Sequence, residues 1–199
     1  IAVHPNYAEN GWIYISYAKK VPGGGATTVA RFKLKGANAT DFQDLIVTTP
    51  AWNGGTHYGS RIVFDKSNFL YFTNGERNTM TNAQDLSNSH GKVHRIKDDG
   101  SIPADNPFVN TAGAVASIWT YGNRNPQGMI YDQVNNRIWS VEHGPQGGDE
   151  LNLIEKGKNY GWPVITYGIN YNGAPISNIT AKDGMEQPKH YWVPSIATC

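Results

Sequence analysis

The sequence predicts an all-β fold made of repeated four-stranded units, and three observations support this prediction. Aromatic residues make up 12% of the 199 residues and 22 are Gly, a composition typical of short strands joined by many turns. Short runs of aromatic and β-branched residues alternate with polar turns, as strands of antiparallel sheets do. An apolar strand, a polar turn and an aromatic strand recur at offsets of about 60 and 67 residues. No segment predicts a long helix.

The first two predicted strands lie at 12–18 and 29–35. Residues 12–18 are aromatic and β-branched, which favours a strand. Residues 29–35 alternate basic with apolar side chains, the period of a half-exposed strand. Gly23, Gly24 and Gly25 stand between them and predict a loop.

The later strands follow the same design of an apolar strand, a polar turn and an aromatic strand. They are predicted at 61–64 with 69–73 and at 128–131 with 137–141. Alternation over 92–96 predicts another strand, so His90 and His94 are not expected to form a helical metal-binding pair. One short helical turn is predicted around 83–86.

A four-stranded unit that repeats along a chain is typical of a β-propeller. About three such blades are visible, and we treat residues 1–199 as one partial propeller domain without a second domain. Propellers usually close with about four to eight blades, and three blades leave sheet edges unpaired. We therefore expect the chain to be an internal part of a longer ring. The alternative is a homodimer in which two copies pair into a pseudo-ring.

Composition also excludes several classes of protein. The formal net charge is +1, so no strong field attracts nucleic acid or an anionic membrane. No apolar run approaches the ~20 residues that a membrane-spanning helix needs. The single Cys199 excludes a disulfide within the chain and a cysteine-based zinc site.

Three polar clusters adjoin predicted strands, where loops on a rigid β scaffold commonly carry function. His57, between glycine-rich stretches, suits a general base or is a loop histidine bonded to backbone. Residues 121–128 hold an arginine, two asparagines and a glutamine, which suit a ligand rich in carbonyl or carboxylate oxygens or a self-bonded turn. Residues 142–150 combine glycines, a proline and acidic side chains, which suit an oxygen cage for Ca²⁺ or an acidic surface turn.

Taken together, the motifs resemble the soluble quinoprotein sugar dehydrogenases, the glucose/sorbosone dehydrogenase family that includes the aldose sugar dehydrogenases. The resemblance runs in order along nearly the whole chain. The matching stretches are 57–64, 83–86, 91–93, 99–108, 124–128, 143–154 and 159–163.

The resemblance implies a six-bladed propeller that holds pyrroloquinoline quinone (PQQ) and Ca²⁺ at one end of its channel. His57 matches the general base that takes the proton of the sugar's anomeric hydroxyl. Arg124 and Asn125 match residues that contact the quinone, with Arg124 placed to stabilise charge on a quinone oxygen. Gln84 is expected to face the cofactor.

For the metals, the resemblance implies two sites. Gly144 and Pro145 match positions whose backbone carbonyls bind the catalytic Ca²⁺. Glu150 and Tyr160 match positions near a second, structural Ca²⁺ of some members. Thr56 stands where some glucose-oxidising members have an acidic residue, so the resemblance does not specify the sugar.

The implied function is oxidation of an aldose to a lactone, with hydride passing to PQQ and electrons to an external acceptor. The implied location is periplasmic or secreted. One alternative is a calcium-dependent lactonase-like propeller, which would present several acidic side chains to its ion. The other is a non-catalytic propeller that binds sugar or protein and needs neither His57 nor Arg124.

Overall fold

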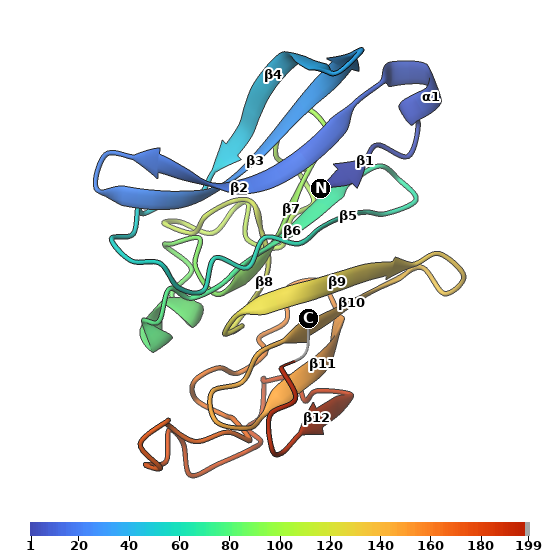
Figure 1. Ribbon diagram of the computed structural model, residues 1–199. Coiled ribbons are helices and arrows are strands. Elements are labelled where there is room, and N and C mark those ends of the chain that lie inside the picture. Colours follow the sequence, from blue (N-terminus) through green and yellow to red (C-terminus); the bar gives the residue numbers. More distant parts are fainter. Residues whose placement is uncertain (198–199) are drawn as a thin grey trace.

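The computed structural model describes residues 1–197, so Cys199 lies outside the described residues. Its strands form three antiparallel sheets of four strands each (Figure 1). The helical elements are α1 (Tyr7–Asn10) and the short 3₁₀ helix η1 (Met80–Ala83). The predicted all-β architecture with about three four-stranded blades is confirmed.

Each blade is a meander of four consecutive strands. Blade 1 contains β1 (Ala2–Val3), β2 (Ile13–Val21), β3 (Gly24–Lys35) and β4 (Asn38–Val47). Blade 2 contains β5 (Ile62–Phe64), β6 (Leu70–Asn74), β7 (Lys92–Ile96) and β8 (Ile118–Tyr121). Blade 3 contains β9 (Pro126–Asp132), β10 (Arg137–Glu142), β11 (Asp149–Ile154) and β12 (His190–Trp192).

The glycine-rich stretch after β2 differs from the sequence prediction. Gly24 and Gly25 open β3, because pairing with β2 continues as far as Val21 opposite Gly24. A Cβ on Gly24 would lie 2.2 Å from the Trp52 carbonyl oxygen, so glycine allows this backbone approach. The helical turn predicted at 83–86 is also displaced, because η1 ends at Ala83.

Blade packing follows from the two faces of β6. Leu70 and Phe72 enter a core shared with blade 1, whereas Tyr71 enters a core shared with blade 3. Successive side chains of a strand point to opposite faces, so every residue of β6 is buried. A strand buried on both faces favours apolar residues. This holds for Leu70, Tyr71 and Phe72, whereas Thr73 and Asn74 are polar and buried.

The strand directions bring four loops to one end of blades 2 and 3. The segment before β5, the segment after β6, the β8–β9 connection and the β10–β11 connection all lie at this end. The β5–β6 and β9–β10 turns lie at the opposite end. The first strands of the two blades, β5 and β9, contact each other. None of the helices within residues 1–197 is long and apolar enough to cross a membrane.

Candidate functional site

His57 lies in the loop before β5 and is held by a buried acidic partner. Its Nδ1 lies 2.5 Å from Oε1 of Glu76, whose side chain is 1% exposed. Glu76 comes two residues after β6 ends. A proton on Nδ1 that is donated to Glu76 leaves the Nε2 lone pair available as an acceptor. The Asn78 N–H also lies 3.3 Å from Nδ1. With the proton on Nδ1, His57 has the arrangement that a general base requires.

Arg77 holds the backbone of the same loop. Its guanidinium donates 2.6 Å to the His57 carbonyl and 2.8 Å to Oγ1 of Thr27 in blade 1. It also stacks 3.6 Å from the centre of the Tyr58 ring. Burial lowers the pKa of Arg77 to about 10. His57 has a left-handed backbone, with φ of 53°, and surrounding contacts are what maintain such a conformation.

Gly75 lies between His57 and Asn125, and Asn125 is the residue directly before β9. A Cβ on Gly75 would lie 2.3 Å from the His57 carbonyl oxygen and 2.6 Å from Oδ1 of Asn125. The Asn125 Oδ1 is buried, and no hydrogen bond from residues 1–197 reaches it. A buried acceptor without a partner costs free energy, so this position is suited to a bound donor.

Arg124 lies beside Asn125 in the β8–β9 connection, and its side chain reaches the β10–β11 turn. Its Nη1 donates 2.9 Å to the His143 carbonyl and 2.8 Å to the Gly144 carbonyl. Its guanidinium carbon lies 5.4 Å from the Trp162 ring centre. The Gly144 carbonyl, a predicted Ca²⁺ ligand, therefore already faces a cation.

The β10–β11 turn depends on its glycines. A Cβ on Gly144 would lie 2.2 Å from the Gly147 carbonyl oxygen, so only glycine fits this tight fold. The Gly144 N–H donates to Oδ1 of Asp149, 2.9 Å away. Pro145, the second predicted carbonyl ligand, follows Gly144 in this turn. It is buried against Gly168, which lies after β11.

Two glutamates oppose each other where β10 ends and β11 begins. Glu142 is paired with Glu150 in the sheet register, and the Nδ2 of Asn152 lies 3.1 Å from an oxygen of each. Burial, followed by the charge of Glu142, raises the pKa of Glu150 to about 8. Burial also raises the pKa of Glu142. Both line a cavity of about 10 Å³, room for one water-sized occupant.

The side chains of Gln84 and Tyr160 both form hydrogen bonds within the chain. The Gln84 amide pairs with Asn159 and donates 2.7 Å to the Trp162 carbonyl, so it joins blade 2 to blade 3. The Tyr160 hydroxyl donates to the Leu153 carbonyl and accepts from the Glu155 N–H. Tyr160 lines the cavity between the glutamates, but its hydroxyl is already used.

The structure therefore brings the predicted site residues to one end of the blades, around Arg124. It also adds Glu76, Arg77 and Glu142, which the sequence analysis did not select. Of these, only Glu142 had a sequence signal, since it opens the acidic cluster at 142–150. Within residues 1–197, no three His, Cys, Asp or Glu side chains gather as a metal-binding group.

Comparison with known proteins places this geometry in context. The family model described as Glucose / Sorbosone dehydrogenase matches residues 1–199. The aldose sugar dehydrogenase YliI of Escherichia coli (strain K12) is 43% identical over 99% of this chain, which covers 54% of that protein.

Solved structures agree. The crystal structure of the soluble aldose sugar dehydrogenase from Escherichia coli in the apo-form matches 96% of this chain with a TM-score of 0.92 and 42% identity, over 56% of its own length. The PQQ-bound aldose sugar dehydrogenase from Streptomyces coelicolor matches 96% with a TM-score of 0.72 and 27% identity, over 52% of its length. The chain thus spans about half the length of these proteins.

Proposed function

The chain belongs to the glucose/sorbosone dehydrogenase family, and on that premise we propose that the full-length protein is a PQQ- and Ca²⁺-dependent aldose dehydrogenase. Its reaction is oxidation of the anomeric C–OH of an aldose to the lactone carbonyl, with electrons passed on to an external acceptor. By the same family resemblance, the protein works in the periplasm or outside the cell.

The observation that carries this proposal is the His57–Glu76 pair beside Asn125. His57 takes the proton of the anomeric hydroxyl on Nε2 while Glu76 holds Nδ1 at 2.5 Å. Loss of that proton makes the anomeric carbon a hydride donor, and a C=O double bond replaces the C–H bond. When bound, PQQ supplies the hydride acceptor and Ca²⁺ supplies Lewis acidity.

The residues near Asn125 fit such a cofactor. The buried Oδ1 of Asn125 has no hydrogen-bond partner within residues 1–197 and suits a bound donor. By the family resemblance, the Arg124 guanidinium would stabilise charge on a quinone oxygen. The carbonyls of Gly144 and Pro145 would hold the catalytic Ca²⁺. Because the Gly144 carbonyl already accepts from Arg124, a bound Ca²⁺ competes with that guanidinium.

The opposed glutamates fit a second, structural Ca²⁺. Carboxylate oxygens are ligands that Ca²⁺ prefers. Burial and the charge of Glu142 raise the pKa of Glu150, and a cation held between the two carboxylates would offset that repulsion. Glu150 would offer its carboxylate. Tyr160 would offer only its backbone carbonyl, because its hydroxyl is bonded to Leu153 and Glu155.

The test uses the full-length protein reconstituted with PQQ and Ca²⁺, with dye reduction followed over a panel of aldoses. Replacing the base, in His57→Ala, is expected to lower kcat by about 10²–10⁴. The matched control is His190→Ala, since His190 is exposed on β12, and it should match the wild type. Absence of dye reduction with every aldose contradicts the dehydrogenase proposal, and an unchanged rate in His57→Ala contradicts the assigned base.

A further inference from the structure

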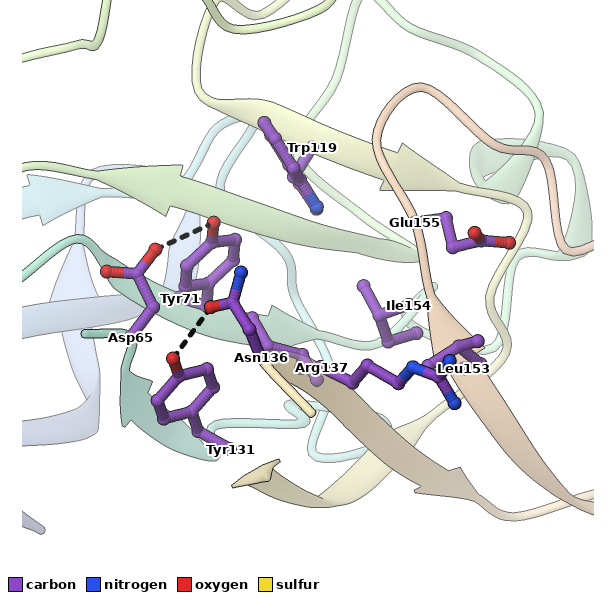
Figure 2. Close-up of a pocket in the computed structure, with 10 residues that line it drawn as sticks. Asp65, Tyr71, Trp119, Tyr131, Asn136, Arg137, Leu153, Ile154 and Glu155 are labelled. Atoms are coloured by element: carbon purple, nitrogen blue, oxygen red, sulfur yellow. Dashed lines mark hydrogen bonds between the residues drawn. The ribbon is translucent and has the colours of Figure 1, made fainter. Parts of the chain in front are cut away.

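A second opening lies at the other end of blades 2 and 3, away from His57. We call it the interblade cleft, a hollow of about 310 Å³. This volume is at the lower end of the range for small-ligand pockets, which starts near ~300 Å³. Its walls come from both blades (Figure 2). Its lining includes Asp65, Tyr71, Trp119, Asn136, Arg137 and Glu155.

Aromatic side chains on rigid strands form one side of the interblade cleft. Tyr71 of β6 and Trp119 of β8 meet edge to face, with ring centres 5.6 Å apart at 83°. Tyr71 belongs to the buried core between the blades, and Trp119 packs against it. Figure 2 shows the indole nitrogen of Trp119 directed into the opening. Tyr71 is buried and supports Trp119 from behind, and Arg95 and Lys156 lie 4.7 and 5.8 Å from the centre of the Trp119 ring. The wall therefore offers the half-buried indole of Trp119, with its N–H donor.

Polar groups from the turns face this wall. Tyr131 donates 2.7 Å to Oδ1 of Asn136, which leaves the Asn136 NH₂ as a donor. Asp65 uses Oδ1 for two backbone N–H groups, and its Oδ2 meets only the Tyr71 hydroxyl, at a long 3.3 Å. Oδ2 therefore keeps most of its capacity to accept a hydrogen bond.

Two charged side chains of opposite sign complete the rim. Figure 2 shows Arg137 and Glu155 on the side of the opening away from Asp65. Arg137 and Glu155 are exposed, and none of the ion pairs within residues 1–197 involves either side chain. Together with Asp65, the lining carries two carboxylates and one guanidinium, so it does not favour an anion.

We propose that the interblade cleft is a second, non-catalytic binding site for an uncharged saccharide unit. A pyranose ring presents C–H groups that pack on aromatic surface, and hydroxyls that need donors and acceptors in turn. The cleft offers the first in the half-buried Trp119, and the second in Asp65, Asn136 and Glu155. This site shares no residue with the candidate site at His57, so it does not depend on the proposed dehydrogenase function.

The test measures binding of methyl α-D-glucopyranoside to the full-length protein by isothermal calorimetry and saturation-transfer NMR. This probe has no free anomeric hydroxyl, so the proposed dehydrogenase chemistry cannot consume it. The cleft variant is Asn136→Gly with Glu155→Ala. Both side chains are exposed, and Asn136 has a left-handed φ of 53° that glycine tolerates. Val134→Ala is the control, since Val134 is 92% exposed in the same turn.

The cleft variant is expected to raise Kd by at least about tenfold, since it removes two hydrogen-bonding groups. Val134→Ala and His57→Ala should bind like the wild type. The proposal is overturned if no saturable binding occurs, if the cleft variant binds normally, or if only His57→Ala loses binding. Tighter binding of gluconate than of the glucoside also overturns it, because the cleft would then select an anion. Failure of the dye-reduction assay alone leaves the cleft proposal intact.

Discussion

At the scale of single residues, two consecutive residues, Glu76 and Arg77, hold different parts of His57. Glu76 contacts the imidazole and Arg77 contacts the main-chain carbonyl. A base must be held within hydrogen-bond reach of the proton it removes. We therefore propose that Glu76 and Arg77 are positioning residues, because their contacts are with His57 itself.

Glu76→Gln tests this positioning role. The amide keeps the size of the side chain but removes the charge that favours a proton on Nδ1, so kcat should fall by at least about tenfold. Dye reduction by the PQQ-loaded full-length protein measures it. Glu9→Gln is the control, because Glu9 is an exposed acid on α1. A kcat equal to that of the wild type would show that Glu76 does not orient the base.

His94 allows a prediction about pH. Its ring stacks on Phe72 with centres 4.7 Å apart, and burial lowers its pKa to about 3. Burial likewise lowers the pKa of His90 to about 4. An unfolded histidine has a pKa near ~6.5, so between about pH 6.5 and 3 the unfolded chain binds more protons. Stability is therefore expected to fall as pH falls, by up to about 1.4 kcal/mol per pH unit for each histidine.

Urea unfolding at pH 7 and pH 5 measures this loss. In His94→Gln the difference between the two pH values should shrink, although stability at pH 7 also falls because the stacking is lost. His190→Gln, on the exposed strand β12, should keep the wild-type difference. An unchanged pH difference in His94→Gln would contradict the assignment of acid sensitivity to this residue.

At the scale of elements, the end of β6 controls how closely the His57 loop approaches β9. Gly75 is the first residue after β6, and the His57 carbonyl and the Asn125 amide both lie against its Cα. No side chain fits between the two segments. The spacing of the candidate site is therefore decided by one residue without a side chain.

Gly75→Ala should disturb stability and activity together. The new Cβ would lie 2.3 Å from the His57 carbonyl oxygen, so we expect a loss of about 1–3 kcal/mol and a kcat at least about tenfold lower. Thermal unfolding and dye reduction measure the two effects. Gly55→Ala is the matched control, because a Cβ there has nothing within 4 Å. Wild-type values for both variants would rule out close packing at Gly75.

At the scale of the whole molecule, the blades are joined by loop side chains as well as by apolar cores. Gln84 and Asn159 exchange amide hydrogen bonds of 3.0 and 2.8 Å between blades 2 and 3. Arg61 donates 3.0 Å to the Gln127 carbonyl across the same boundary. Contacts of this kind set the relative position of the loops that form the site.

A double-mutant cycle on Gln84→Ala and Asn159→Ala tests this link. Residues that share hydrogen bonds are expected to show a coupling energy of about 1 kcal/mol, measured by urea unfolding of the full-length protein. Gln84→Ala combined with Asn172→Ala should be additive, because Asn172 is exposed in a distant turn. Additivity in both pairs would show that the amide pair does not couple the blades. PQQ titration of Gln84→Ala tests its predicted cofactor contact separately.

Local patterns in the sequence predicted much of the fold. The strands β2, β5, β6, β7, β9 and β10 and the later part of β3 were predicted, because alternation and turn residues are local properties. The strands β4, β8, β11 and β12 were missed. In β4 the apolar pattern is weak, and β11 lies inside a stretch whose glycines and acids favour a turn. Sheet pairing overrides such local preference.

The sequence alone determined the repeated β architecture and yielded a list of candidate binding residues, because residue chemistry and strand period are local properties. Only the tertiary structure paired His57 with Glu76, placed Arg124 on the Gly144 carbonyl, opposed Glu142 to Glu150 and opened the interblade cleft. These contacts join segments through sheet register and blade packing. The residues that form these contacts are present in the sequence, but the pairing and packing of the sheets determine which of them come into contact.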